Sequence, residues 1–176
     1  LTTALGVAAA GGIPGARGQT TGGELVWKFE TIAPMYSSPT VVDGSVYIAT
    51  LNDTVYSVNE SSGEEEWAYT TGESVYSSPL VRNGTVFIGS DDSSVHAIGA
   101  DTGEQQWTFE TGDVIKSSPT AAGDNILIGS GDSNVYAIEQ TSGEQQWAFE
   151  TGGGIVSSPT VTEQSAFIGS GDGNLY

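Results

Sequence analysis

The sequence predicts an all-β fold, a β-propeller built from about four blades of 40 residues, each blade a four-stranded antiparallel sheet. Two observations lead to this prediction. Tryptophan recurs at a constant interval of 40 residues, and the tripeptide Ser-Ser-Pro recurs in the same register. Each repeat also holds four short runs of β-branched and aromatic residues, separated by Gly, Asp, Asn and Ser.

Three markers keep their spacing through the copies of the repeat. The tryptophans are Trp27, Trp67, Trp107 and Trp147. The Ser-Ser-Pro triplets begin at Ser37, Ser77, Ser117 and Ser157, and a Gly-Glu pair precedes each tryptophan. No segment has a 3.6-residue period, which excludes helical repeats. We expect the indoles to lie between neighbouring blades, where they bury the most apolar surface.

The strands can be assigned in order within the first complete copy. They are residues 37–42, 45–50, 54–59 and 64–70. Asp43-Gly44 separates the first two runs and is a two-residue hairpin signal, because both positions tolerate a positive φ. The second run is apolar on both faces, as expected of a strand inside a stack. The fourth run contains Trp67 and ends at a Thr-Gly pair.

Charge limits the possible functions. Four basic residues face 22 acidic ones, for a net charge of −18. Such a surface repels nucleic acids and anionic membranes, so we expect no nucleic-acid partner. An ordinary acidic exported protein and a halophilic, haloarchaeal protein both fit, and the scarcity of lysine favours the second. The chain has no cysteine, which excludes disulfides, thiolate catalysis and cysteine-type zinc sites.

The first 20 residues differ in composition from the rest. They are apolar and rich in alanine, then small and polar, as in the remnant of a signal peptide or a flexible leader. The stretch is too short for a membrane span of about 20 apolar residues, so we expect no integral membrane segment. We expect export, to the cell surface or beyond, with the repeats occupying residues 21–176.

A motif surrounds two of the tryptophans. Ala97, Thr102, Gly103 and Trp107 form one copy, and Ala137, Ser142, Gly143 and Trp147 form the next. This pattern resembles the tryptophan-docking motif A-x-D-x-x-T-G-x-x-x-W of the pyrroloquinoline-quinone (PQQ) enzyme repeat family, with Gly99 in place of the acid in the first copy and Glu139 at the acid position in the second. The resemblance implies that each indole docks onto the next blade. The docking residues it implies are Trp27, Trp67, Trp107, Trp147, Gly63, Gly103, Gly143, Ala97 and Ala137.

The resemblance implies two functions. The family includes quinoprotein dehydrogenases and non-enzymatic propellers such as the assembly lipoprotein of the outer-membrane β-barrel machinery. The dehydrogenases are associated with a vicinal cysteine pair, a calcium site and an Asp base. This chain has no cysteine, and no Asp stands apart from its repeat copies. We therefore favour a non-catalytic, protein-binding scaffold with no evident cofactor. The alternative is part of a PQQ-dependent alcohol or sugar dehydrogenase that binds PQQ with calcium.

The number of copies bears on the size of the ring. Propellers have about 4–8 blades, and the resemblance implies seven or eight. The chain holds roughly three and a half copies, begins without Met and stops at Tyr176, inside an expected third strand. We therefore expect a fragment of a longer chain, whose remaining blades would be its first partners.

Four segments break the repeat. They are residues 32–36, 73–76, 113–116 and 153–156, each just before Ser-Ser-Pro, and we call them the variable segments. They lead into the first strand, which lies nearest the axis of a propeller, where loops carry function. The candidate channel-mouth residues are Tyr36, Glu73, Tyr76, Asp113 and Lys116. Neutral drift of an exposed loop is the alternative interpretation.

Two further features have structural interpretations. His96, the only histidine, occupies the position of Tyr56 and Tyr136 in other copies, so we expect it to pack with one polar tip and not to act in catalysis. Acidic turns recur at Asp53, Asp91-Asp92, Asp132 and Asp172. They lack the spacing of an EF-hand, so we interpret them as hairpin turns, with weak surface binding of calcium or sodium as the alternative.

Overall fold

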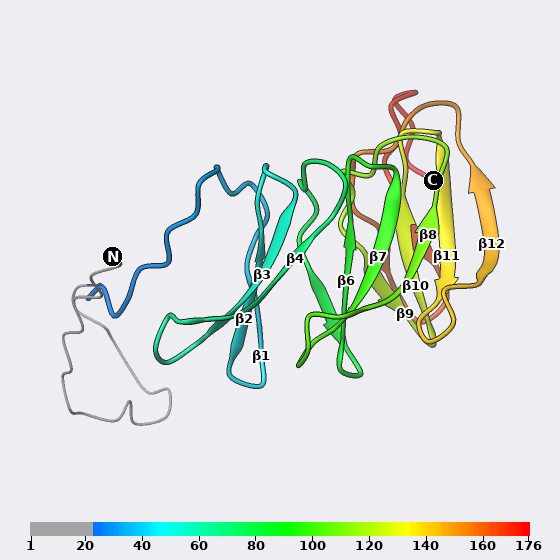
Figure 1. The fold of residues 1–176 in the computed structure, drawn as a ribbon. Coiled ribbons are helices and arrows are strands. Elements are labelled where there is room, and N and C mark those ends of the chain that lie inside the picture. Colours follow the sequence, from blue (N-terminus) through cyan, green and yellow to red (C-terminus); the bar gives the residue numbers. More distant parts are fainter. Residues whose placement is uncertain (1–22) are drawn as a thin grey trace.

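The computed structural model describes residues 23–176 (Figure 1). The expected leader, residues 1–20, lies outside the described residues. Every described element is an antiparallel β-strand, and the strands form three four-stranded sheets and one two-stranded sheet. The prediction of an all-β fold is therefore confirmed. Between residues 23 and 176 there is no helix of a length and hydrophobicity that could cross a membrane.

Each sheet follows chain order, so each is one blade. The first blade comprises β1 (Thr40–Val42), β2 (Ser45–Ala49), β3 (Thr54–Asn59) and β4 (Glu65–Thr70). The second comprises β5 (Leu80–Arg82), β6 (Thr85–Gly89), β7 (Ser94–Gly99) and β8 (Gln105–Glu110). The third comprises β9 (Thr120–Ala122), β10 (Asn125–Gly129), β11 (Asn134–Glu139) and β12 (Gln145–Glu150). The two-stranded sheet pairs β13 (Thr160–Val161) with β14 (Ala166–Phe167). Figure 1 shows the blades following one another from cyan through green and yellow to red.

The first strand of each blade begins later than predicted. The expected run covered residues 37–42, whereas β1 begins at Thr40. Pro39 has no N–H to donate to a ladder. Ser37 instead bonds to Ala49 twice, because its hydroxyl donates to the Ala49 carbonyl and accepts from the Ala49 N–H, each at 3.0 Å. The other predicted boundaries of this blade differ from the observed ones by one residue at most.

The hydrophobic core lies in the seams between sheets. All five residues of β6 are buried, which explains why the second run of the repeat is apolar on both faces. One core cluster joins Tyr47, Val55 and Trp67 of the first blade to Val86 and Ile88 of the second. A single blade could not bury both of its faces, so each sheet depends on its neighbours for its core.

Trp27, Trp67 and Trp107 each close a seam, whereas Trp147 remains 43% exposed beside β12. The Trp67 ring is 9% exposed, and its Nε1–H donates to the carbonyl of Ala100 in the next blade at 2.7 Å. Trp27 and Trp107 make the same bond, to Glu60 at 2.7 Å and to Gln140 at 3.0 Å. The bond spans 33 residues each time, so one geometry repeats from seam to seam.

A glycine lies against each docked indole. Gly103 has φ +69°, and a Cβ atom at this position would lie 2.8 Å from Cγ of Trp67. Gly63 and Gly143 stand in the same relation to the rings of Trp27 and Trp107. Ala97 is fully buried opposite Trp107 in the β7–β8 pair, and Ala137 is likewise buried opposite Trp147. Small residues therefore stand where an indole needs room.

We predict that Gly103→Ala destabilises the chain more than Gly84→Ala does. Both glycines have positive φ, but a Cβ at Gly84 would meet nothing within 4 Å. Gly84→Ala therefore carries backbone strain alone, about 1–2 kcal/mol. Gly103→Ala adds a steric conflict with Trp67 of a further ~1–3 kcal/mol. Urea unfolding followed by tryptophan fluorescence measures both, and equal losses would contradict this account of the seam.

Candidate functional site

The blades are held together at their first strands by a ladder of serine side chains. The Ser38 N–H donates to Ser78 Oγ at 2.8 Å, and the Ser78 N–H donates to Ser118 Oγ at 2.8 Å. The Ser118 N–H continues the series to Ser158 Oγ at 2.9 Å. Contacts between β1 and β5, and between β9 and β13, lie at the same edge. The serine ladder thus links each blade to the next at this edge.

The last three variable segments are each anchored at this edge by one buried side chain, Val75, Ile115 or Ile155. In residues 73–76 the Val75 N–H donates to Thr50 of the preceding blade at 3.2 Å, and the Val75 side chain is fully buried. The Ser74 carbonyl accepts from the Asp91 N–H of its own blade at 2.9 Å. Tyr76, the last residue of the segment, remains 37% exposed. The backbone of the segment is thus fixed, and its exposed side chains, Glu73 and Tyr76, can vary without changing the seam.

We call the last residues of the four variable segments the side-chain row: Tyr36, Tyr76, Lys116 and Val156. The rings of Tyr36 and Tyr76 stack with centroids 6.1 Å apart and planes at 24°. The Lys116 ammonium lies over the Tyr76 ring, 4.8 Å from its centroid. Val156 ends the row and is 67% exposed. The structure therefore brings together three of the five predicted channel-mouth residues.

The other two predicted residues, Glu73 and Asp113, supply exposed carboxylates at the same end of the blades. The carboxyl of Asp91, in the turn between β6 and β7, interacts electrostatically with Lys116, Glu73 and Asp113. Burial raises the pKa of the Asp91 carboxyl, while Lys116 acts in the opposite direction. Its Oδ1 is buried and accepts no hydrogen bond from the described residues. Sequence comparison of the copies could have singled out Asp91, because the matching positions hold Leu51, Gly131 and Gly171.

The recurrent acidic turns connect blades. Oδ2 of Asp132 accepts from the N–H of Gly112, at the end of the preceding blade, at 2.7 Å. The same oxygen accepts from the Tyr136 hydroxyl at 2.7 Å, and Oδ1 accepts from the Asn134 N–H. Among residues 23–176, no three His, Cys, Asp or Glu side chains gather closely enough to hold a metal ion. These turns are thus occupied by protein hydrogen bonds.

The hydrogen bonds of this turn shift the pKa values of both Asp132 and Tyr136. Burial opposes ionisation of Asp132, but bonds from Tyr136, Asn134 and Gly112 outweigh it and hold the pKa of the carboxyl below its usual value. Burial and the bond to Asp132 raise the pKa of Tyr136 to about 12. The Tyr–Asp pair therefore keeps a neutral phenol and an ionised carboxylate across the ordinary pH range.

His96 replaces this tyrosine in the second blade and keeps its contacts. Its Nε2 lies 2.9 Å from Asp92 Oδ2, and its Nδ1 lies 2.9 Å from the Tyr69 hydroxyl of the first blade. The Tyr69 ring meets it edge-on, as Phe109 meets Tyr136 one seam later. The expected single polar contact is in fact two. Burial lowers the pKa of His96, although Asp92 acts in the opposite direction.

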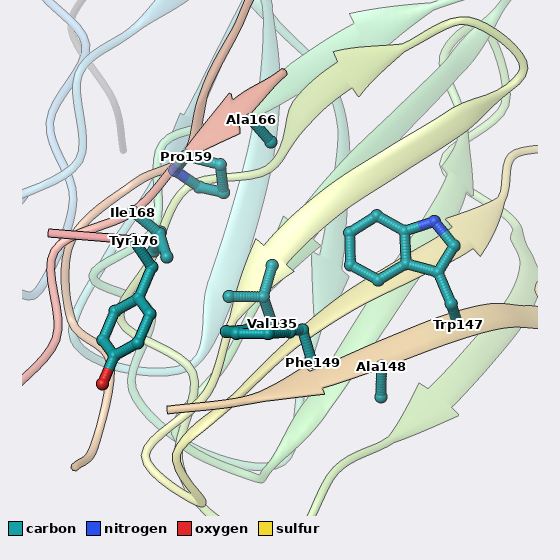
Figure 2. A pocket seen from close by; sticks show the side chains of 8 residues that line it. All are labelled: Val135, Trp147, Ala148, Phe149, Pro159, Ala166, Ile168 and Tyr176. Atoms are coloured by element: carbon teal, nitrogen blue, oxygen red, sulfur yellow. The ribbon is translucent and has the colours of Figure 1, made fainter. Parts of the chain in front are cut away.

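An apolar hollow of about 550 Å³ lies beside β12. Figure 2 shows Trp147 and Phe149 on one side of it and Pro159, Ile168 and Tyr176 on the other. Val135, Trp147 and Ile168 correspond, 80 residues on, to Val55, Trp67 and Ile88, which fill the first seam. The hollow is therefore a later copy of the seam between blades.

Comparison with known proteins bears on family and fold. The family model described as "Outer membrane protein assembly factor BamB" matches residues 16–115 and 91–176. No curated protein matches the sequence.

Three solved structures illustrate the likeness. BamB from Moraxella catarrhalis superposes with a TM-score of 0.75 and 18% identity, over 84% of this chain and 47% of that one. The quinohemoprotein alcohol dehydrogenase ADHIIG from Pseudomonas putida HK5 gives 0.64 and 24%, over 70% of this chain and 22% of that one. The computationally designed Ika4 protein gives 0.79 and 13%, over 88% and 96%. The chain thus spans about half of the BamB structure and about a fifth of the dehydrogenase. These likenesses confirm the β-propeller fold.

We predict that acid weakens the native chain through His96 and that His96→Tyr removes this effect. The folded-state pKa of His96 is lowered, so the unfolded chain binds more protons as the pH falls through about 6.5. Stability contributed by the neutral imidazole is present above that pH and is lost below it. His96→Tyr restores the residue found at Tyr56 and Tyr136 and has no group that titrates there.

The measurement is the urea midpoint at pH of about 7.5 and about 5.5, on either side of the ordinary histidine pKa. The native midpoint should fall between the two, and that of His96→Tyr should fall less. An identical drop in both proteins would show that His96 does not carry the pH dependence.

Proposed function

Because this chain belongs to the family of the outer membrane protein assembly factor BamB, we propose that it is a non-catalytic, exported scaffold that binds another protein through its side-chain row. One observation carries this proposal. The last position of the variable segment holds tyrosine, lysine or valine, and three of these exposed side chains, Tyr36, Tyr76 and Lys116, contact one another in series, while the tryptophans and glycines of the seams recur in every copy.

The physical support comes from how the two sets of positions are used. Residues such as Val75 and Trp67 are buried in seams, so their exchange would leave cavities or clashes. Tyr36 and Lys116 are exposed and close no seam, so they can be chosen for contact with a partner. Tyrosine is enriched at protein interfaces, because it offers a large contact area and a polar tip.

The proposed location outside the cytoplasmic membrane rests on the leader and on the family. The alanine-rich residues 1–20 have the composition of a signal-peptide remnant. The family model bears the description of an outer-membrane assembly factor, which agrees with export. The absence of cysteine permits an oxidising compartment without indicating one.

Site-specific crosslinking tests the proposal. The chain has no cysteine, so Tyr36→Cys and Asp101→Cys each create a single attachment point for a photoreactive maleimide. Asp101 is exposed in the turn between β7 and β8, at the opposite end of its sheet from the variable segment. We expect the Tyr36 position to crosslink one partner protein in envelope extracts, and the Asp101 position not to.

A captured protein supports the proposal only if, once purified, it binds the native chain and binds Tyr36→Leu more weakly. A partner crosslinked equally from both positions, or one indifferent to Tyr36→Leu, would rule out the side-chain row as the binding surface.

A second candidate function, part of a PQQ-dependent dehydrogenase, draws support from the fold likeness to the Pseudomonas putida dehydrogenase. The described residues fit that role poorly. Calcium prefers six to eight oxygen ligands, whereas residues 23–176 contain no group of three acidic or histidine side chains that could hold a metal. The carboxylates of Asp132 and Asp172 already accept hydrogen bonds from tyrosine hydroxyls. We derive no chemical step through PQQ.

This candidate is tested directly by adding PQQ and calcium to the protein. We expect no change in the quinone absorption spectrum and no dye-linked oxidation of alcohols or sugars. A bound-quinone spectrum together with substrate-dependent dye reduction would replace the scaffold proposal with the enzymatic one.

A further inference from the structure

The side-chain row already contains one bound cation, and that contact shows what else it can hold. The Lys116 ammonium lies 4.8 Å from the centroid of the Tyr76 ring. An ammonium over an aromatic face is attracted by the negative charge of the π-system. Tyr76 in turn stacks on Tyr36, which lies one blade earlier. The row thus runs from a cation, across one ring, to a second ring.

The ring of Tyr36 is the more exposed of the two. Tyr36 is 69% exposed, against 37% for Tyr76. Within residues 23–176 its ring stacks on Tyr76 and on no other aromatic side chain. The serine ladder beside it fixes the distance between the blades, which holds the two rings in place. An aromatic face held rigidly in solvent loses little entropy when a ligand stacks on it.

Residues 23–176 place no second cation on the Tyr36 ring. The described residues include three basic side chains, Lys28, Arg82 and Lys116. Lys28 is paired with Glu30. Arg82 ends β5, next to the β5–β6 turn, at the opposite end of its sheet from the variable segment. Lys116 is already seated on Tyr76. Among residues 23–176, therefore, no cation lies over the Tyr36 ring.

Charge around the row favours a basic partner. Glu73 and Asp113 are exposed, and with Asp91 they surround Lys116 closely enough to influence its electrostatic environment. Three carboxylates against one ammonium leave this end of the blades negative. The chain as a whole carries a net charge of −18, which draws basic partners and repels acidic ones.

We propose that the side-chain row binds a basic segment of a partner protein, with a Lys or Arg side chain of that segment stacked on the exposed ring of Tyr36 and its other charges facing Glu73 and Asp113. This inference rests on the proposed function and adds the chemistry of the partner. Arginine suits the site best, because its planar guanidinium both stacks on a ring and donates to carboxylates.

The test uses a fluorescent, amidated peptide of alternating Arg and Gly as the probe, and a matched peptide with Gln in place of each Arg. Anisotropy titrations of the 176-residue chain should show binding of the Arg peptide and none of the Gln peptide. Tyr36→Leu should weaken the Arg peptide roughly two- to fivefold, which is the size of an exposed cation–π contact. Tyr36→Phe keeps the ring and should bind as the native chain does.

A charge-matched pair separates this site from general attraction. Glu73→Gln and Glu104→Gln each remove one negative charge, but Glu104 lies at the opposite end of its sheet, in the β7–β8 turn. We expect weaker binding for Glu73→Gln and native binding for Glu104→Gln. Equal losses in the two variants, or native affinity in Tyr36→Leu, would overturn the proposal. All four variants change exposed residues, and unchanged melting temperatures would show that they fold.

The outcome is distinguishable from failure of the proposed function. If crosslinking from Tyr36 finds a partner whose contact segment is neutral or acidic, the scaffold function stands and the basic-segment inference fails. If the Arg peptide binds at Tyr36 but no partner protein is found there, the inference about chemistry stands and the scaffold function fails.

Discussion

Everything in this fold depends on one contact, an indole seated on the turn of the next blade. Trp67 donates to a carbonyl 33 residues ahead, and Gly103 leaves room for its ring. The sheets are apolar on both faces, so without this contact each would expose a core. Because the bond always joins one blade to the next, stability passes along the chain from neighbour to neighbour, as in other repeat proteins.

The sequence could predict this contact because it is periodic. A constant interval between tryptophans, with a glycine ahead of each, is visible without any structure. The strand pattern was predictable for the same reason, and β3 has the predicted bounds. The start of the first strand was not, because Ser37 resembles a strand residue in composition. Only the structure shows that its hydroxyl is bonded to Ala49 and replaces the ladder that Pro39 cannot join.

The candidate site was predictable in location but not in geometry. Where copies of a repeat differ, packing has ceased to dictate the residue, and this alone drew attention to Tyr36, Tyr76 and Lys116. The stacking of these side chains could not be foreseen, since residues 40 positions apart touch only if their blades converge at that point. The sequence alone shows that His96 takes the position of a tyrosine in other copies, which predicted a packed side chain with a polar tip. Its two partners, Asp92 and Tyr69, come from different blades and become apparent only in three dimensions.

The division between fixed and free positions also explains how such a scaffold acquires a function. The last three variable segments each place one side chain into a seam and the next into solvent, as Val75 and Tyr76 do, whereas Met35 of the first segment is 42% exposed. A change at the buried position alters the packing of two blades, whereas a change at the exposed position alters only the surface. Because the serine ladder sets the spacing between blades, any side chain placed in the row meets its neighbours at stacking distance. The fold thus supplies a rigid line of adjustable contacts, and a strongly acidic chain that has placed two tyrosines and one lysine there has built a surface suited to cations.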